Sequence, residues 1–270
     1  MHSQRIPKHL LFCLLWLIHQ GNGAENLNDT AKMHLDTNST PFPPLFPQGR
    51  IVNGNSANER QFPYQVSLRY HGYHICGGSI LSQNYVVTAA HCVKNNPAWT
   101  LTIRAGSRLV NSGGQVVRVS EVKIHPSYRN FGNDIALLKL SQPVKFNDTV
   151  KAIALARKAP TSGAAVLTSG WGRLGKSIPN TPRVLQYTIL NALTNGECKR
   201  RLLFVEPNIL CLAHPAGKGV CSGDSGGPAV YKNELVGVTN YVVAGCASAY
   251  PDGYANVAYH YNWLKSNAGL

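Results

Sequence analysis

Short runs of β-forming residues follow one another from residue 51 onward, separated by turn-forming Gly, Asn and Pro. The clearest runs are residues 64–68, 85–88, 115–119 and 235–239. Many short strands with few helical patterns are typical of sandwiches and barrels, so the pattern predicts an all-β domain. Over residues 257–267 the spacing of apolar positions becomes helical and predicts a terminal helix that docks through Trp263 and Leu264.

The first part of the chain has a different pattern. Arg5 and Lys8 precede an apolar run over residues 10–18, and small residues follow around Gly21 and Gly23. This order predicts a secretory signal peptide at residues 1–23. The run is too short to cross a bilayer, and no later segment of the 270 residues is apolar for long enough. We therefore expect a secreted, extracellular protein with no membrane span.

Residues 24–50 are rich in Asn, Thr and Pro and have little capacity to pack, which predicts an extended propeptide. Acceptor triplets for glycosylation begin at Asn28, Asn38 and Asn147, so we also expect a glycoprotein. The folded domain is then residues 51–270.

The formal net charge is +14, from 26 Lys and Arg against 12 Asp and Glu. Such a field favours acidic partners such as anionic glycans, although a solvated basic surface without a dedicated partner is the simpler explanation. Basic residues are scattered apart from residues 199–201, which argues against nucleic-acid binding.

Seven cysteines are present, and Cys13 falls inside the predicted signal peptide. The other six form an even number that suits disulfides in an oxidising compartment, and six cysteines allow fifteen pairings.

Three motifs carry candidate chemistry. His91 lies in Thr-Ala-Ala-His-Cys, Asp134 in Asn-Asp-Ile-Ala-Leu-Leu, and Ser225 in Cys-Ser-Gly-Asp-Ser-Gly-Gly-Pro. A serine hydroxyl is a weak nucleophile unless a neighbouring base accepts its proton, and a histidine with a near-neutral pKa suits that task. The motifs and their order, His then Asp then Ser, resemble the trypsin and chymotrypsin family of secreted serine proteases over about residues 51–270.

The resemblance implies two antiparallel six-stranded β-barrels with a C-terminal helix, so that residues 51–270 are a peptidase domain of two barrel halves with the active site in the cleft between them. It further implies a monomer that needs no cofactor. Ser225 would attack the peptide bond and form an acyl-enzyme, His91 would act as base, and Asp134 would orient His91. The backbone N–H groups of Gly223 and Ser225 would form the oxyanion hole.

The resemblance also implies a zymogen. A trypsin-like activating protease would cut after Arg50, and the new ammonium of Ile51 would pair with the buried carboxylate of Asp224. Other implied partners are protein or peptide substrates and protein protease inhibitors. The implied disulfides are Cys76–Cys92, Cys198–Cys211 and Cys221–Cys246, while Val166 and Tyr231 stand where relatives carry a further bridge.

The implied specificity pocket resembles that of neutrophil elastase. Gly219 stands where trypsin-like relatives carry an acid, Val220 and Val242 narrow the pocket, and Asp252 lies deeper in its wall. Ser222, Asn240 and Tyr241 are the other residues assigned to substrate binding. This pattern favours cleavage after small aliphatic residues; cleavage after Lys or Arg through Asp252, and a preference for larger apolar residues, remain alternatives.

Asn240 replaces a serine that bonds the triad carboxylate in relatives, and its amide is expected to donate to Asp134 similarly. A feebly active, protease-like binding protein is therefore a further alternative. We expect no calcium site, since Gly106-Ser107-Arg108 lacks the carboxylates, and no other metal site, since His71 and His74 are interpreted as surface residues.

Overall fold

The computed structural model describes residues 51–175, 181–202 and 205–270. The predicted signal peptide and propeptide, including Arg50, lie outside the described residues.

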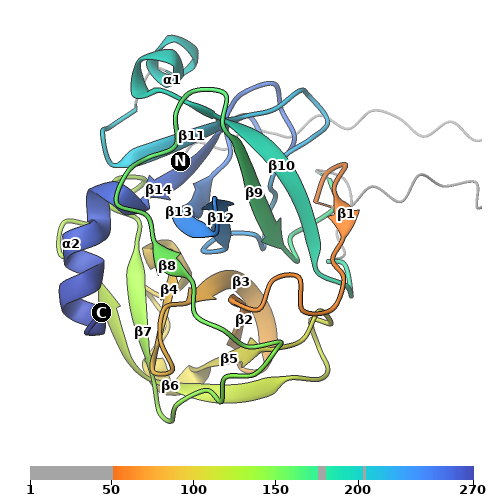
Figure 1. The fold of residues 1–270 in the computed structure, drawn as a ribbon, viewed down its shortest axis with the longest axis vertical. Helices are drawn as coiled ribbons and strands as arrows, with labels where there is room; N and C mark the ends of the chain where they lie inside the picture. The colour runs from red at the N-terminus through yellow and green to blue at the C-terminus, as the bar shows by residue number, and fades with distance from the viewer. Residues whose placement is uncertain (1–50, 176–180, 203–204) are drawn as a thin grey trace, which may run out of the picture. The chain divides into compact units, whose positions relative to one another are not determined.

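The domain is mostly β-structure with one long helix at its end (Figure 1). The strands are β1 (Asn55–Ser56), β2 (Gln65–Tyr70), β3 (Tyr73–Ile80), β4 (Tyr85–Thr88), β5 (Leu101–Ala105), β6 (Gln115–Ile124), β7 (Ala136–Leu140), β8 (Ala154–Leu155), β9 (Ala165–Gly170), β10 (Gln186–Leu193), β11 (Ile209–Ala213), β12 (Pro228–Tyr231), β13 (Glu234–Tyr241) and β14 (Asp252–Asn256). The helices are α1 (Asn195–Arg201), α2 (Val257–Ala268) and two 3₁₀ turns, η1 (Ala90–Cys92) and η2 (Ala98–Thr100). All four strand runs and the terminal helix predicted from the sequence are present.

The first half closes into a six-stranded antiparallel barrel in the order β2-β3-β4-β7-β6-β5. Alternation of side chains explains its interior: on β5, Leu101, Ile103 and Ala105 are buried while the residues between them are half-exposed. Most of the apolar cluster that fills the barrel comes from these six strands and the turns that join them.

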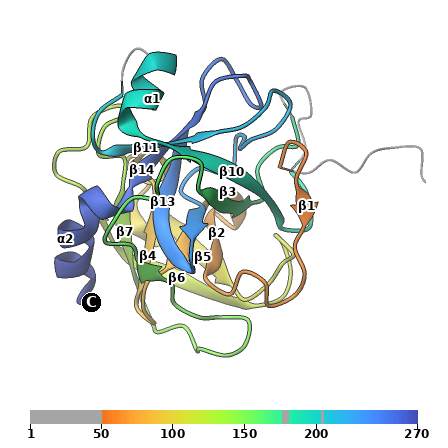
Figure 2. The same ribbon diagram turned by 45° about the horizontal axis from the view of Figure 1, so that its top comes forward.

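The second half closes through β10-β11-β14-β13-β12-β9 and the pairing of β9 with β10 (Figure 2). Strand β1 adds to β10, and β8 pairs in parallel with β13. Val166 is buried in this barrel and Tyr231 packs against the same apolar cluster, so apolar packing occupies the place of the missing disulfide. The two-barrel fold implied by the resemblance is confirmed.

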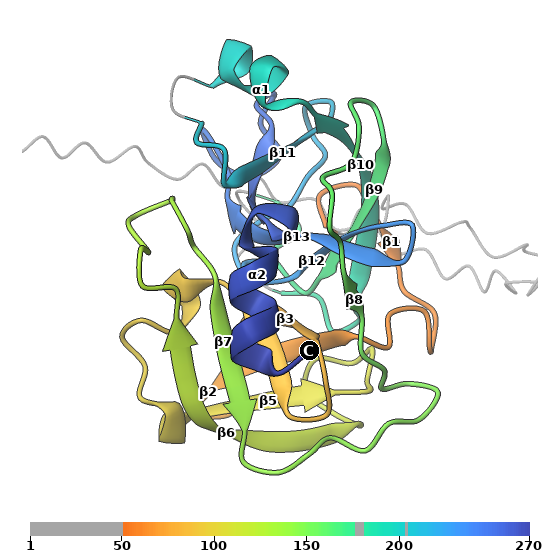
Figure 3. The ribbon, with the colours of Figure 1, turned by 60° about the vertical axis from the view of Figure 1, so that its left-hand side comes forward.

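Helix α2 contacts strands of both halves: β7 of the first, and β8, β13 and β14 of the second sheet (Figure 3). Asn256 caps its first turn by accepting from the Ala258 N–H at 3.1 Å, and Gly269 ends it in the left-handed conformation. Leu264 is buried within the apolar cluster of the first barrel and Trp263 packs against it, as predicted. The same cluster contains Val230, Leu235 and Val238 of the second half, so the last helix packs against both halves.

The disulfides are Cys76–Cys92, Cys198–Cys211 and Cys221–Cys246, the pairing that the resemblance implies. In the part of the chain that the structure describes, no helix combines the length and apolarity needed to cross a bilayer.

Candidate active site

Strand pairing brings His91 and Asp134 together. Thr88 at the end of β4 lies opposite Ala136 at the start of β7, so the residues just after β4 and just before β7 meet at the same edge of the barrel. The Asp134 carboxylate accepts from the His91 backbone N–H at 2.8 Å and pairs with His91 Nδ1 at 2.5 Å. A carboxylate only accepts, so Nδ1 carries the proton and Nε2 keeps its lone pair.

The exposure of these two side chains differs in a way that suits proton transfer. The Asp134 side chain is fully buried, whereas 32% of the His91 side chain is exposed. The buried carboxylate therefore fixes the tautomer and the ring orientation, while the imidazole reaches the surface where a second reactant can approach.

Ser225 comes from the second barrel and lies against the first. Its carbonyl oxygen accepts from the Gly77 N–H of β3 at 2.7 Å. A Cβ added to Gly77 would lie 2.8 Å from the Gly227 Cα, and one added to Gly226 would overlap the Thr88 hydroxyl. The nucleophile motif and the strand ends that lead to His91 are therefore in backbone contact, which the glycines permit.

The carboxylate of Asp224 points away from solvent into the second half. Oδ1 accepts from the Gly172 N–H at 2.7 Å, and Oδ2 accepts from the Cys221 N–H at 2.9 Å. The pKa of Asp224 is raised to about 7, chiefly by burial; the two backbone donors lower it and the nearby charge of Asp252 adds to the increase. Hydrogen bonds alone leave a buried negative charge costly.

Ile51 is fully buried, and the residues after it lie against the loop before β12. Val52 forms a β-bridge with Gly219, and Asn53 Nδ2 donates to the Gly217 carbonyl at 2.7 Å. The predicted activation segment and the predicted pocket loop are thus in direct contact.

His74 was expected at the surface, and this expectation is wrong. Its ring packs edge-on against Trp171, Nδ1 lies 2.8 Å from Ser67 Oγ, and Nε2 lies 3.1 Å from the Gly223 carbonyl oxygen. Burial lowers the pKa of His74 to about 4. The neutral ring therefore accepts from the Ser67 hydroxyl and donates to the Gly223 carbonyl oxygen. This bond fixes the backbone of Gly223, whose N–H is a predicted oxyanion donor. His71, in contrast, is exposed as expected.

The predicted pocket residues converge on Asp252, which is buried at the start of β14. Its Oδ2 accepts from the Val220 N–H at 2.9 Å, and a Cβ added to Gly219 would lie 2.8 Å from the same oxygen. Val220 is buried in the apolar cluster against which Val242 packs. Ser222 is exposed, and its carbonyl accepts from the Arg173 N–H.

Asn240 does not make the contact expected of it. Its amide donates to the Phe131 carbonyl oxygen at 2.8 Å, and both Asp134 oxygens are bound to His91 instead. The Tyr241 ring stacks over Gly253 and lies 5.1 Å from the Phe131 ring. Asn240 and Tyr241 together anchor the loop that precedes Asp134.

Two open pockets flank this aromatic contact. One, of about 640 Å³, is lined by Arg129, Phe131, Lys199 and Tyr241 among others; the second, of about 570 Å³, is largely apolar and includes Val242 and Tyr250. Both pockets lie beside the predicted specificity pocket.

A family model described as Trypsin matches residues 51–264. The chain belongs to the trypsin family. It is therefore a serine protease, that is, a hydrolase.

The curated relatives of this trypsin-family chain agree. Trypsin delta of Drosophila melanogaster is 43% identical over 233 residues, which span 83% of this chain and 91% of that protein. Serine protease SP24D of Anopheles gambiae is 38% identical over 227 residues, spanning 83% of each. Among solved structures, mouse neuropsin, a serine protease expressed in the limbic system of the brain, aligns with a TM-score of 0.75 at 28% identity, covering 80% of this chain and 98% of that one.

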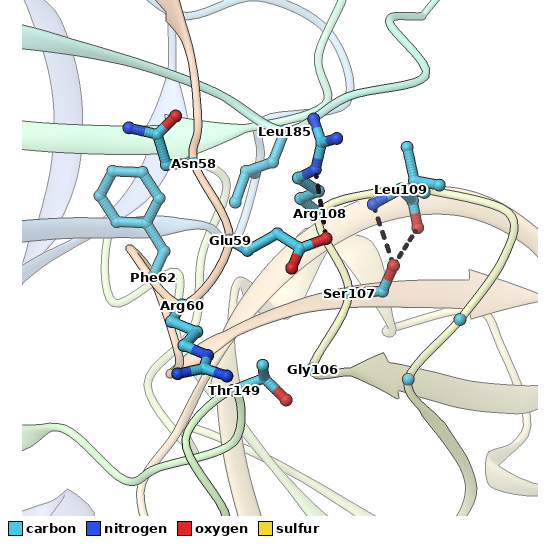
Figure 4. A pocket seen from close by; sticks show the side chains of 12 residues that line it. Asn58, Glu59, Arg60, Phe62, Gly106, Ser107, Arg108, Leu109, Thr149 and Leu185 are labelled. Carbon is cyan, nitrogen blue, oxygen red and sulfur yellow. Dashed lines mark hydrogen bonds and ion pairs between the residues drawn. The ribbon is translucent and has the colours of Figure 1, made fainter.

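A further pocket, of about 290 Å³, lies between the segment before β2 and the β5–β6 loop (Figure 4). It includes the loop where trypsin-like relatives bind calcium. Here Arg108 is 3.9 Å from Glu59, and Ser107 Oγ bonds the backbone of Leu109. One carboxylate that faces an arginine does not fit a calcium ion, which needs several oxygen ligands.

Within the described residues, one group has the proximity required of metal ligands: Cys76, His91 and Cys92. The two cysteines form a disulfide, so they offer no thiolate.

One residue near the pocket was missed by the sequence analysis of this trypsin-family chain. The His214 side chain is fully buried, and its Nε2 lies 3.2 Å from Asp252 Oδ2. The segment His-Pro-Ala-Gly-Lys-Gly reads as an ordinary loop. The sequence did contain one indication of this contact. Gly219 stands where trypsin-like relatives carry an acidic residue, and the missing side chain leaves space that another residue can fill.

Proposed function

We propose that this chain is a secreted serine endopeptidase, made as a zymogen, that hydrolyses peptide bonds after small aliphatic residues. The observation that supports it most is the buried Asp134 paired with the partly exposed His91, in the barrel whose strand β3 bonds the Ser225 carbonyl through Gly77. His91 Nε2 takes the Ser225 proton as its oxygen attacks the substrate carbonyl. Asp134 stabilises the imidazolium that forms, and His91 returns the proton to the leaving amine. Water then releases the acyl-enzyme by the same route.

The oxyanion of each tetrahedral intermediate accepts from the N–H groups of Gly223 and Ser225. Gly223 has a φ of +99°, and His74 holds its carbonyl from behind. A donor fixed in this way contributes about 3 to 4 kcal/mol to transition-state stabilisation.

Activation by cleavage after Arg50 follows from the cost of burying Asp224. The released ammonium of Ile51 pairs with this carboxylate, and the contacts of Val52 and Asn53 transmit the change to the pocket loop. A trypsin-like protease supplies the cut, because the pocket of this chain does not suit an arginine.

Specificity rests on Val220, Val242 and Asp252. The two valines share one apolar cluster, and the Asp252 carboxylate is buried and bonded, so a small aliphatic side chain fits best. Discrimination is graded, about 1 to 3 kcal/mol per methylene. The partners are protein and peptide substrates and protein protease inhibitors; anionic glycans suit the net charge of +14, and Asn147 is exposed for glycosylation.

Cleavage after Lys or Arg is the second candidate, because several relatives are named trypsins. It requires a substrate cation to reach Asp252.

The experiment is a peptide-library profile of the protein cut after Arg50, with labelling of Ser225 by a serine-directed phosphonate. The proposal expects labelling, loss of hydrolysis in S225A, and cleavage after Val and Ala. Hydrolysis that persists in S225A refutes the mechanism, and faster cleavage after Arg than after Val selects the second candidate.

A further inference from the structure

The carboxylate of Asp252 lies beside a buried imidazole inside the protein. The His214 side chain has no exposed surface, and Nε2 lies 3.2 Å from Asp252 Oδ2. On the other side of the ring, Nδ1 lies 3.1 Å from the Pro215 carbonyl oxygen. Both neighbours offer oxygen atoms. The Nε2–Asp252 contact is close enough for an ion pair but is not aligned as a hydrogen bond, so it favours a protonated ring through charge, whereas Nδ1 can donate to the Pro215 carbonyl.

The absence of a side chain at Gly219 leaves space for His214 and Asp252 to meet. A Cβ at this position would lie 2.8 Å from Asp252 Oδ2 and 2.9 Å from His214 Nε2, and the φ of Gly219 is +136°. The space where trypsin-like relatives carry their acidic residue is therefore filled here by an imidazole and a carboxylate from two other segments of the chain.

We propose that His214 determines specificity by positioning and neutralising Asp252: as an imidazolium held by Asp252 and the Pro215 carbonyl, it removes the unpaired negative charge that a substrate lysine or arginine needs. This inference rests on the proposed function of the same pocket. His214 acts through Asp252 and touches no reacting atom, so it is a positioning residue.

The charges around the imidazole agree with a protonated ring. Asp252 on β14 raises the pKa of His214, the Pro215 carbonyl raises it too, and burial and the charge of Lys218 oppose them; the net direction is upward. Asp224 lies near enough to Asp252 for their charges to interact. The positive charge of His214 therefore also offsets repulsion between two buried carboxylates.

The inference predicts a particular pH dependence. Because the pKa of His214 is raised above its ordinary value, the ring is an imidazolium at low pH and loses its proton as pH rises through the folded-state pKa. Above that pH, the Asp252 carboxylate no longer has a cationic partner. Selectivity for Arg over Val, measured as the ratio of kcat/KM values, should then rise with pH.

The test compares H214Q, D252N and H214Q/D252N with the wild type, all cut after Arg50 and all titrated with the phosphonate to count active sites. Matched peptides differ only in Val or Arg before the scissile bond. We expect H214Q to raise the Arg-to-Val ratio of kcat/KM about tenfold or more and to abolish the dependence of this ratio on pH. Adding D252N, in H214Q/D252N, should remove the increase. An unchanged ratio in labelled H214Q protein overturns the role of His214 and leaves the proposed function intact.

A second measurement does not depend on activity. In uncut S225A protein, NMR titration of His214 should show protons on both ring nitrogens at pH 6 and a pKa above the ordinary 6.5, which falls in S225A/D252N. A neutral ring at pH 6 overturns the inference, whereas failure of Ser225 labelling in the wild type refutes the proposed function alone.

Discussion

The Gly77 N–H donates to the Ser225 carbonyl oxygen at 2.7 Å, so a strand of the first barrel holds the nucleophile motif of the second. No side chain takes part in this bond. Backbone geometry at Gly77 therefore helps to position Ser225. A substitution at Gly77 can test this contact without changing a catalytic side chain.

Substituting Gly77 with alanine should impair both activity and stability. The new Cβ would lie 2.8 Å from the Gly227 Cα, which is backbone and cannot rotate away. We expect a loss of about 1 to 3 kcal/mol in unfolding free energy, from urea titration. We also expect a fall in kcat/KM of about 10²-fold, because such a shift misplaces the nucleophile. In the control, G196A, the Cβ meets nothing closer than Arg200 at 4.0 Å, so kcat/KM should be unchanged, and unfolding free energy should not fall, because alanine favours the helix that contains this position.

His74 should make the protein less stable in acid. Its pKa is about 4 in the folded protein and about 6.5 when unfolded, so the unfolded chain binds more protons between these values and stability falls as pH drops from 6.5 toward 4. H74Q should reduce that slope by up to about 1.4 kcal/mol per pH unit, measured by urea titration. The pKa of His260 is also lowered to about 4, so part of the dependence of stability on pH should remain in H74Q. H71Q, at an exposed site, should leave it unchanged.

Cleavage after Arg50 should stabilise the protein in a pH-dependent manner. In the uncut chain the pKa of Asp224 is raised to about 7, so its favourable contribution is present below about pH 4 and is lost as pH rises toward 7. An ammonium partner removes this cost. In an S225A background, the gain in unfolding free energy on cutting should therefore be larger at pH 7.5 than at pH 5. D224N should abolish this difference, and an equal gain at both pH values would contradict the pairing.

Widening the pocket should broaden specificity. Val242 packs against the cluster that contains Val220, so V242G opens space between them. We expect kcat/KM for Leu and Phe before the scissile bond to rise relative to Val by about 10- to 200-fold in a peptide library. V243G is the matched control, because Val243 packs against a different cluster, around Cys198 and Cys211. A comparable change of specificity in V243G would contradict the assignment of selectivity to Val242.

Restoring the acid of trypsin-like relatives should fail by itself. G219D directs a side chain at Asp252 and His214 and adds a third carboxylate near Asp224. We expect a loss of about 3 kcal/mol or more in stability and little cleavage after Arg. The triple variant G219D/D252G/H214A removes both side chains that a Cβ at position 219 would meet, and it should cleave after Arg. A stable, Arg-specific G219D enzyme would show that the pocket is not filled as described.

The strand pattern was sufficient for an all-β domain, because strand periodicity and turn residues are local signals, and the resemblance carried by the three motifs implied the two barrels that the structure has. The sequence was insufficient for the histidines. His74 is buried by Trp171 and Gly223, which come from the other half of the chain, and His214 gains its partner only when β14 is in place. Asn240 bonds Phe131 because the loop before Asp134 folds onto it, and loop conformation has no signature in residue spacing.

The position of α2 at the end of the chain has a consequence for synthesis. Val257, Leu264 and Ala268 belong to one apolar cluster that also contains strand residues of both halves. This shared cluster cannot reach its final packing until residues 257–268 have been translated. A nascent chain that has not yet reached residue 257 therefore lacks the packing that α2 provides against both halves.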